Sequence, residues 1–521
     1  MKPLSRKLTF EMPIPTEEDP RSDLDRVLDT LRPGFGRPRV SLGVMRSLYP
    51  ACRAGDGRIT ATLLWEGDAW ELTAVESGDT AGEHYGLAAD LGSTSVTMEL
   101  VDLNRGTVVG RASRYNGQTA VGSDILTRIF YGKDQPEHRE ELRRLAAETL
   151  TALMDQLAEE TGVDTRRCAA MVLAGNTTMV HFLLGLDAYP LFLSPYAPVV
   201  SAPGFVPAEQ LGLPLSCPVY LYPARANYMG GDIISGMVAT GVARGEGIRL
   251  FFDIGTNGEL VAGCKDFLVS GAGAAGPALE GSVIRTGMCA GKGAVEHVSI
   301  RSDKVRLKII GGGKARGICG SGIVDLLAEL FLEGVIDFRG TFQPERSGRV
   351  ELVGGELAYR YADGHRAQGG EPLWFYQSDI RQFLDTKAAA YTMVAYMMEA
   401  VGMDFSDVEA FYVAGAFGTY IDTRSAVTIG LYPDIPPEKI RCVGNSSLEG
   451  ARCLLLDRGH LEEIDGILQR MDYIQYGAIP NFVETMQAAA AIPHLDMARY
   501  PSVEKRLRRR RKNWKSPGQL S

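Results

Sequence analysis

Two widely separated stretches combine an aspartate with glycine and small polar side chains. Residues 90–95 read Asp-Leu-Gly-Ser-Thr-Ser and residues 253–258 read Asp-Ile-Gly-Thr-Asn-Gly, each directly after an apolar run. A second apolar run follows each stretch, so the pattern predicts a strand, a tight turn and another strand. Backbone N–H groups and hydroxyls of such a turn can bind phosphate oxygens, and the aspartate can hold a hydrated Mg²⁺ ion. An ordinary hairpin is the alternative for either stretch taken alone.

A third glycine-rich turn, Gly-Ala-Phe-Gly at 415–418, follows the apolar residues 411–414. A P-loop or a dinucleotide fingerprint would continue into a helix, whereas 90–95 and 253–258 continue into strands. Three turns in this order predict two similar lobes around one nucleotide, with a phosphate hairpin in each lobe and the third turn under the adenosine. The arrangement resembles the two-lobed α/β fold of the actin, hexokinase and Hsp70 superfamily, which is RNase H-like and binds ATP.

This resemblance implies a residue set for ATP and Mg²⁺. Asp90 and Asp253 would hold the metal through water, and Asp232 or Glu280 would position the attacking water. Polar turns at 175–178 and 317–322 open predicted helices and can donate N–H groups to an anion. An ordinary helix cap, or for Asp232 a charge at a helix N-terminus, is the alternative. The candidate binding residues are Asp90, Gly92, Ser93, Thr94, Ser95, Asn176, Thr177, Asp253, Gly255, Thr256, Asn257, Gly320, Ser321, Gly415, Ala416, Phe417 and Gly418.

The composition is that of an ordinary globular protein. Of 521 residues, 45% are hydrophobic and 23% are charged, and the formal net charge is −9. This length predicts two or three domains, and the negative charge argues against a general nucleic-acid binder. No apolar run approaches the roughly 18 residues of a membrane span, and no signal-peptide pattern opens the sequence. We therefore expect a cytoplasmic protein that binds neither membrane nor nucleic acid.

The eight cysteines form no recognised ligand pattern. They are scattered along the chain, and no Cys-x-x-Cys pair occurs. Zinc and iron–sulfur sites need thiolates at workable spacings, so we expect neither within one chain. A cluster that bridges two subunits through single cysteines is the alternative. Most of the cysteines are expected to be small buried hydrophobes, and Cys319, inside the turn at 317–322, is the one whose position calls for inspection.

Changes in composition along the chain predict four parts. Residues 1–35 are expected to be a linker with one helix, which Ser22 caps and Pro33-Gly34 ends. Residues 36–84 are expected to form a small α/β middle domain, and residues 85–500 the two-lobed ATPase domain. Residues 501–521 are rich in lysine and arginine and are expected to be a flexible, solvated tail. Contact of this tail with an acidic partner is the alternative.

Eight motifs in order narrow the resemblance to one family. They resemble the reductive activators of corrinoid-dependent methyltransferases and corrinoid iron–sulfur proteins over residues 85–495, and residues 1–82 resemble the linker and middle domains of that family. The resemblance implies an ATP-dependent homodimer that binds an inactive Co(II) corrinoid protein and helps return it to Co(I). The motifs are LAADLGST (87–94), GNTTM (175–179), GGDI (230–233), DIGTNGE (253–259), AGPALEG (275–281), GICGSG (317–322), SDIR (378–381) and AGAFG (414–418).

The sequence departs from the family in one respect. Family members usually carry a fused iron–sulfur domain, whereas this sequence starts at the linker and ends in the basic tail. We therefore expect the electron to come from a separate low-potential donor that resembles a ferredoxin. Two alternatives to an ATP-dependent activator of corrinoid proteins are a small-molecule kinase of the same superfamily and an ATP-binding adaptor without turnover, because a fold alone does not decide function.

Overall fold

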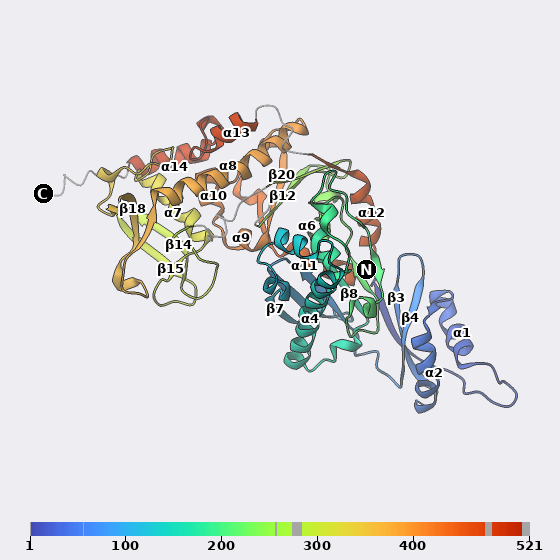
Figure 1. The fold of residues 1–521 in the computed structure, drawn as a ribbon. Coiled ribbons are helices and arrows are strands. Elements are labelled where there is room, and N and C mark those ends of the chain that lie inside the picture. The colour runs from blue at the N-terminus through green and yellow to red at the C-terminus, as the bar shows by residue number, and fades with distance from the viewer. Residues whose placement is uncertain (1, 56, 256–257, 274–283, 475–481, 513–521) are drawn as a thin grey trace. The chain divides into compact units, whose positions relative to one another are not determined.

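The computed structural model describes residues 2–512 apart from residues 56, 256–257, 274–283 and 475–481. The chain divides into two compact units, whose elements are drawn in Figure 1. Unit 1 contains Met1–Gly241 and Ser446–Arg470, and unit 2 contains Val242–Asn445 and Met471–Ser521. Each unit is therefore built from two separate segments of the sequence.

The first part of unit 1 is a four-stranded sheet with two helices packed against it (Figure 1). The strand order is β1-β3-β4-β2, and β1 pairs antiparallel with β3 along its whole length. The predicted cap of the first helix is confirmed, because the Ser22 side chain accepts the N–H of Asp25. The elements are β1 (Ser5–Glu11), α1 (Asp23–Phe35), β2 (Arg39–Val40), α2 (Leu42–Ala54), β3 (Arg58–Trp65) and β4 (Trp70–Ser77).

The second part of unit 1 is a six-stranded sheet of order β7-β6-β5-β8-β10-β9. Strands β5, β6 and β7 form an antiparallel meander, whereas β8 runs parallel to β5 and β10 runs parallel to β8. The strands are β5 (Tyr85–Leu91), β6 (Ser95–Asp102), β7 (Thr107–Tyr115), β8 (Ala170–Gly175), β9 (Gly204–Val206) and β10 (Val219–Leu221).

Helices pack on both faces of this sheet. Side chains alternate along a strand, so Leu87 and Ala89 of β5 pack toward α4, whereas Asp90 contacts α11. Helix α6 packs against α11 on that second face. The helices are α3 (Ile125–Gly132), α4 (Pro136–Thr161), α5 (Thr177–Leu183), α6 (Gly231–Thr240), α11 (Ser446–Leu456) and α12 (His460–Arg470).

Unit 2 repeats the strand order of unit 1. Its sheet has the order β21-β20-β11-β12-β13-β22, in which β11, β12 and β13 are an antiparallel meander and β20 and β21 continue in parallel. The run from β13 to β21 thus matches the run from β7 to β10, which confirms the predicted α/β fold with two similar lobes. The strands are β11 (Ile248–Ile254), β12 (Gly258–Gly263), β13 (Leu268–Gly273), β20 (Val408–Ala414), β21 (Ile440–Gly444) and β22 (Met471–Tyr473).

Two three-stranded sheets and further helices complete unit 2. Helix α8 (Gln377–Ala400) packs on β12 and β13, and α7 (Gly320–Glu333) packs on β14. The other strands are β14 (Ala294–Arg301), β15 (Lys304–Ile309), β16 (Gly317–Ile318), β17 (Val350–Val353), β18 (Glu356–Ala362) and β19 (Leu373–Tyr376). Three short α-helices are α9 (Gly415–Tyr420), α10 (Thr423–Ile429) and α13 (Phe482–Ala489).

The last described residues form α14 (Pro501–Lys512), a helix packed on the rest of unit 2. The sequence predicts a flexible, solvated tail from residue 501. The structure instead shows a helix for these twelve residues. The physical reason is that Arg506 and Arg510 bond to Thr428 and Glu329 of unit 2. A run of arginines in a sequence does not reveal which of them lie on the packed face of a helix.

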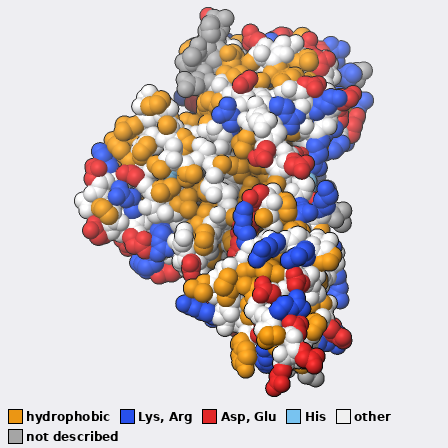
Figure 2. Space-filling model, turned by 90° about the vertical axis from the view of Figure 1, so that its right-hand side faces the viewer, with side chains coloured by type: hydrophobic (Ala, Val, Ile, Leu, Met, Phe, Trp, Pro, Cys, Tyr) orange, Lys and Arg blue, Asp and Glu red, His pale blue; other side chains and the backbone are white. Residues whose placement is uncertain are grey.

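The molecular surface carries charges of both signs. On the face shown in Figure 2, lysine and arginine side chains are interspersed with aspartate and glutamate, with hydrophobic side chains between them. A nucleic-acid interface requires an extended patch of positive charge, and this face offers no extended patch of one sign. Within the described ranges, every helix is too short or too polar to cross a bilayer.

Candidate functional site

The turn between β5 and β6 has the close backbone approach that its glycine predicts. A Cβ atom on Gly92 would lie 2.4 Å from the Ser95 carbonyl oxygen, so a larger residue cannot occupy this position without moving the backbone. Asn116 fixes the turn with two hydrogen bonds. Its Nδ2 donates to Gly92 O at 2.9 Å, and its backbone N–H donates to Thr94 O at 2.9 Å. The turn is therefore fixed by the protein before any ligand arrives.

The hydroxyls of this turn are available to a ligand. Thr94 and Ser95 are exposed, and Ser93 is half-buried. Within the described part of the chain, none of the three side chains makes a hydrogen bond. A rigid turn with three unused hydroxyls is suited to binding an anion with several oxygens, such as a phosphate chain.

Asp90 lies next to this turn, near the carboxyl end of β5. Its Oδ1 accepts a hydrogen bond from the Ser447 hydroxyl at 2.8 Å, which comes from the first turn of α11. The carboxylate is half-buried. Sequence reasoning missed Ser447, although the Gly-Asn-Ser-Ser run at 444–447, which follows an apolar strand and opens a helix, is a signal that could have found it.

The turn after β8 lies beside the turn after β5. The two strands are parallel neighbours, with Leu91 opposite Gly175. The side chains of the turn already have partners within the protein: Asn176 Oδ1 accepts the Met179 N–H at 2.9 Å, and Thr177 Oγ1 donates to Ala226 O at 3.0 Å. Asn176 Oδ1 therefore acts as a helix cap, the alternative that the sequence left open, and the backbone groups of this turn remain candidates for a ligand.

Asp232 is brought to the same edge of the sheet by α6. A Cβ atom on Gly230 would lie 2.6 Å from Asn176 Cα and 2.6 Å from Asp232 Oδ1. The start of α6 thus packs directly on the turn at 175–178, and only glycine allows that approach. Asp232 is half-buried, and its Oδ1 also accepts the N–H of Ile233 at 2.9 Å. Unit 1 therefore gathers Asp90, the 92–95 turn and Asp232 at the carboxyl ends of two parallel strands.

Unit 2 places Asp253 and Gly415 side by side. Strands β11 and β20 are parallel, with Asp253 opposite Ala414. Gly415 has φ +89°, and a Cβ atom there would lie 2.4 Å from Ile254 O and 2.9 Å from Asp253 Oδ1. Both its conformation and its surroundings therefore require glycine. The backbone of Gly415, Ala416, Phe417 and Gly418 forms the start of α9, and Gly255 ends the described part of the β11 turn.

Three predicted residues cannot be placed. Thr256 and Asn257 of the β11–β12 turn and the water-positioning candidate Glu280 lie outside the described residues. The predictions made for these three residues stay predictions.

The turn at 317–322 is used mainly for packing. Ser321 Oγ donates to Glu296 O at 2.9 Å, and Cys319 Sγ donates to Val295 O at 3.3 Å. A Cβ atom on Gly322 would lie 2.3 Å from Val295 O, so this glycine lets α7 approach β14. Ser321 is buried, and the backbone N–H groups of Gly320 and Ser321 remain the part of this turn that a ligand could use.

The carboxylates suit a metal that keeps most of its waters. Among the residues that the structure describes, no three His, Cys, Asp or Glu side chains converge as they do in a protein metal cage. Mg²⁺ is usually bound by one or two carboxylates together with waters and phosphate oxygens. Asp90 in unit 1 and Asp253 in unit 2 are each half-buried near the end of a parallel strand, and each is a carboxylate of the kind that such an ion uses.

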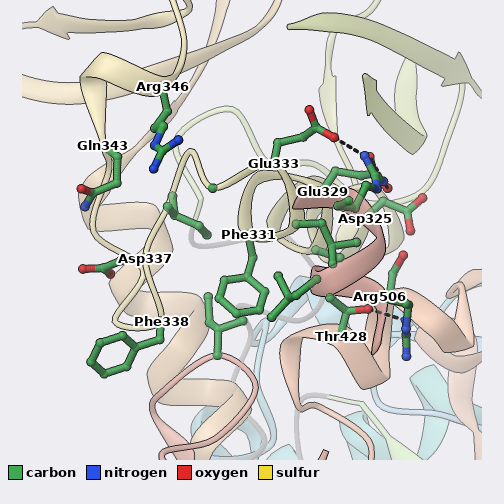
Figure 3. A pocket seen from close by; sticks show the side chains of 18 of the residues that line it. Asp325, Glu329, Phe331, Glu333, Asp337, Phe338, Gln343, Arg346, Thr428 and Arg506 are labelled. Atoms are coloured by element: carbon green, nitrogen blue, oxygen red, sulfur yellow. Dashed lines mark hydrogen bonds and ion pairs between the residues drawn. The ribbon is translucent and has the colours of Figure 1, made fainter. Parts of the chain in front are cut away.

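A separate hollow of about 1580 Å³ lies within unit 2 and contains none of the predicted site residues. Helices α7, α10 and α14 line it together with the segments around 336–346 and 492–497. Figure 3 shows Phe331 at its centre, Glu329, Glu333 and Asp325 on one side, and Gln343 and Arg346 on the other. Arg510 pairs with Glu329 and Glu333 at its wall, and Arg506 donates to the Thr428 hydroxyl.

Three family models match consecutive parts of the chain. Residues 1–82 match the RACo linker region, residues 85–245 match the RACo middle region, and residues 247–504 match the C-terminal domain of RACo, the ASKHA domain. The chain belongs to the RACo family. The resemblance that eight motifs predict is thereby confirmed. The RACo models assign all of residues 1–82 to the linker region and place the middle region at 85–245.

Individual relatives agree with RACo membership. The chain is 33% identical over 421 residues to the corrinoid activation enzyme RamQ of Eubacterium limosum, which covers 79% of this chain and 71% of that protein. It is 23% identical over 422 residues to the Co(II) methylated amine-specific corrinoid protein reductase of Methanosarcina barkeri, with 74% and 73% covered. A solved structure of a reductive activator for corrinoid, iron–sulfur protein superposes with a TM-score of 0.87 at 37% identity, covering 96% of this chain and 81% of that chain.

Proposed function

We propose that this protein is an ATP-dependent activator of a corrinoid protein. It binds and hydrolyses ATP with Mg²⁺ and thereby assists the reduction of a Co(II) corrinoid to Co(I), with the electron supplied by a separate low-potential donor. The observation that carries the proposal is the match of residues 1–504, in three consecutive parts, to the RACo family, together with the fold shared with a reductive activator.

The unit 1 turn supports ATP as the ligand. Its backbone is fixed by Asn116, and the hydroxyls of Ser93, Thr94 and Ser95 have no partner among the described residues. In this proposal they donate to phosphate oxygens, and the corresponding turn after Asp253 does the same in unit 2. The residues at 415–418, which begin α9 beside Asp253, support the nucleoside.

Two carboxylates are assigned to the metal and one to the attacking water. Asp90 and Asp253 would hold hydrated Mg²⁺, whose chemistry is to neutralise the charge that develops on the phosphates. Asp90 is fixed in orientation by the Ser447 hydroxyl. Asp232 lies against the turn at 175–178, where its carboxylate can accept a proton from water and orient it. Glu280 is the second candidate for that role.

The electron balance requires a donor other than ATP. Co(II) gains one electron to become Co(I), and ATP hydrolysis releases free energy but supplies no electron. Two of the cysteines favour a structural role: Cys168 and Cys217 are buried, and burial raises the pKa of Cys168 and raises that of Cys217 to about 12, whereas Cys289 and Cys442 are exposed. Thiols that stay protonated are poor cluster ligands, because clusters bind thiolate.

ATP is coupled to the reduction through the affinity for the corrinoid protein. A protein shifts an equilibrium only by binding one of the two states more tightly, and a shift from 1:99 to 99:1 requires about 5.5 kcal/mol. Nucleotide binding favours a form of this chain that holds the corrinoid protein in its reducible state. Hydrolysis then returns the chain to the form that releases it.

The decisive experiment mixes the purified chain, ATP-Mg²⁺ and a Co(II) corrinoid protein, and follows the corrinoid absorption spectrum under anaerobic conditions. We expect no Co(I) until a ferredoxin or a chemical reductant is added, and faster formation of Co(I) with ATP than without it. ATP hydrolysis should increase when the corrinoid protein is present. Phosphate transfer to a metabolite would support the kinase instead, and nucleotide binding without turnover would support the adaptor.

A further inference from the structure

Three polar side chains lie completely buried behind the 92–95 turn. Asn116, Gln118 and Arg128 each have no measurable exposed surface. They come from one stretch of the sequence, in which Asn116 precedes a 3₁₀ turn at Gly117–Ala120 and Arg128 lies in α3. Buried polar groups are costly unless they are hydrogen-bonded, so three of them together require an explanation.

Hydrogen bonds join these side chains to the turn. Asn116 bonds to Gly92 O and Thr94 O, and its Oδ1 accepts the Gln118 N–H at 3.0 Å. Gln118 Nε2 donates to Leu142 O of α4 at 2.8 Å, and its Oε1 faces Arg128 Nη1 at 3.5 Å. A continuous polar chain therefore runs from the turn through Asn116 and Gln118 to a guanidinium.

Arg128 has no carboxylate partner in the described chain. Its Nε donates to Gly122 O at 2.8 Å and its Nη1 approaches Met179 Sδ at 3.8 Å, whereas Nη2 has no hydrogen-bond partner. The nearest acidic residue in the sequence, Asp124, is exposed and caps the helix by accepting the Thr127 N–H. Burial lowers the pKa of Arg128, yet an arginine stays charged in a protein. The positive charge is thus buried and unbalanced at contact distance, since Asp124 acts on it through space and raises its pKa but does not bond to it.

A buried, unbalanced charge is unfavourable for the folded protein on its own. Replacing buried charges by apolar side chains of similar volume is often neutral or stabilising. The position of Arg128 offers a reason to keep the charge, because its contacts lead in two directions toward the candidate site. One direction is the polar chain to the 92–95 turn, and the other is Met179, whose N–H is bonded to Asn176 of the neighbouring turn.

We infer that Arg128 is an internal counter-charge for the phosphate chain of the nucleotide, and that Asn116 and Gln118 hold it in register with the 92–95 turn. The inference rests on the proposed function, since it needs an anionic ligand at this turn. The low dielectric of the protein interior strengthens the attraction between Arg128 and the phosphates. Arg128 is a positioning residue, because it acts on the ligand without touching it.

The inference predicts a clear effect on affinity and only a small effect on stability. Arg128→Met removes the charge and keeps a long apolar side chain, so affinity for ATP-Mg²⁺ should fall about tenfold, which is about 1.4 kcal/mol. The midpoint of thermal unfolding without nucleotide should change little, because the lost hydrogen bond to Gly122 O and the lost contact with Gln118 Oε1 offset the gain from removing a buried charge. Arg128→Lys keeps the charge but not the planar fork, and should retain an affinity within about threefold of the wild type.

The test is isothermal titration of ATP-Mg²⁺ into the full chain, repeated at low and high salt. Arg144→Met on α4 is the matched control, since Arg144 is half exposed and pairs with Glu148. This control should bind like the wild type. The loss in Arg128→Met should persist at high salt, because buried charges are screened much less than exposed ones. Circular dichroism melts of all four proteins supply the stability readout.

Each outcome of these measurements either supports or overturns the role proposed for Arg128. Wild-type affinity in Arg128→Met would overturn the inference while leaving the proposed function intact. An Arg128→Lys protein as weak as Arg128→Met would show that the shape of the guanidinium matters rather than its charge, which also overturns it. Failure of both variants to fold would assign Arg128 to the core alone. A wild-type chain that does not bind ATP-Mg²⁺ would overturn the proposed function and this inference together.

Discussion

Arg510 of α14 donates from Nη2 to both carboxylate oxygens of Glu329 on α7, at 2.9 and 3.0 Å. Its Nη1 also bonds to Glu333 and to Ile300 O, so one guanidinium joins α14 to a helix and to a strand. The side chains of Arg510, Glu329 and Glu333 are 17%, 15% and 13% exposed. This arrangement fixes the helix that the sequence describes only as a basic run.

The carboxylates that Arg510 contacts have a second role on β14. Backbone N–H groups of Val298, Ile300 and Ser302 donate to Asp325, Glu329 and Glu333, respectively. Alternate residues of a strand lie about 6.6 Å apart and residues four apart on a helix about 6 Å, so the two series stay in step. Acidic residues at every fourth position of α7 thus satisfy N–H groups on the side of β14 that the two-residue strand β16 leaves unpaired beyond Val295.

Arg510→Met should destabilise unit 2 by about 3 kcal/mol. The substitution leaves Glu329 and Glu333 largely buried without their cation, and breaking such a pair from one side costs more than the pair contributes. Urea unfolding monitored by circular dichroism measures the change. Arg508→Met is the control on the same helix: Arg508 is 73% exposed and pairs with Glu504, so its loss should cost less than about 0.5 kcal/mol. Equal effects of the two substitutions would contradict a stabilising role for the contacts of Arg510 with Glu329 and Glu333.

Lys387 is expected to be a second point at which one cation holds unit 2 together. Its fully buried Nζ donates to the carbonyl oxygens of Ala489, Ala491 and Pro493, the last two at 2.6 Å. Burial lowers its pKa, but three acceptors match the three protons of an ammonium group, so we take this lysine to be charged.

Lys387→Met should therefore cost about 4 kcal/mol, because three buried carbonyls lose their donor. The measurement is again urea unfolding, with Lys265→Met as the control; Lys265 is 47% exposed and pairs with Glu246. A cost below about 1 kcal/mol would show that water replaces the ammonium group at these carbonyls.

A pH dependence should arise in the first sheet of unit 1. Burial, and then a hydrogen bond and charge repulsion from the Glu66 carboxyl, raise the pKa of Glu71 to about 7. The folded state thus binds a proton that the unfolded state releases between about pH 4.5 and pH 7. The contribution of Glu71 to stability is present below about pH 4.5 and is lost as the pH rises through about 7.

Glu71→Gln should remove this dependence, since a glutamine cannot ionise. Free energies of unfolding at several values between pH 5 and pH 8 would show it as a flatter profile and a more stable variant at pH 8. Glu159→Gln on the exposed side of α4 is the control and should keep the wild-type slope. A wild-type slope in Glu71→Gln would mean that another group titrates in this range.

The sequence predicts the parts of the site that local pattern encodes. Apolar runs around Asp90 and Asp253 identify the hairpins, and the parallel strands that follow are visible as apolar segments before glycine. Sequence reasoning does not find β1, because a short strand with polar residues is stabilised by its pairing with β3, far along the chain. It misses Ser447 and Arg510 for the same reason: each acts on a residue that is distant in sequence.

Replacement of either aspartate by asparagine should impair ATP turnover in a folded protein. An amide carries no charge for Mg²⁺, so we expect at least a tenfold loss of kcat/KM, or about 1.4 kcal/mol. Asp90→Asn keeps an oxygen that can accept from Ser447, so folding should be preserved. Asp253→Asn should likewise lose turnover and keep its fold if the role of Asp253 is to hold the metal. Asp155→Asn, at an exposed position on α4, is the control. Wild-type turnover in a folded variant would remove that aspartate from the site.

Ser447→Ala should impair turnover less than Asp90→Asn and in a way that depends on Asp90. The Ser447 hydroxyl orients Asp90 Oδ1 at 2.8 Å, and loss of a hydrogen bond to a charged group costs about 1.5–3 kcal/mol when the partner stays buried. Asp90 is only half-buried, so water replaces part of the bond, and a loss of kcat/KM of about fivefold is expected. A double-mutant cycle with Asp90→Asn measures the coupling. If Ser447 acts through Asp90, the second substitution adds almost nothing to the first; fully additive losses would show that Ser447 contacts the nucleotide by itself.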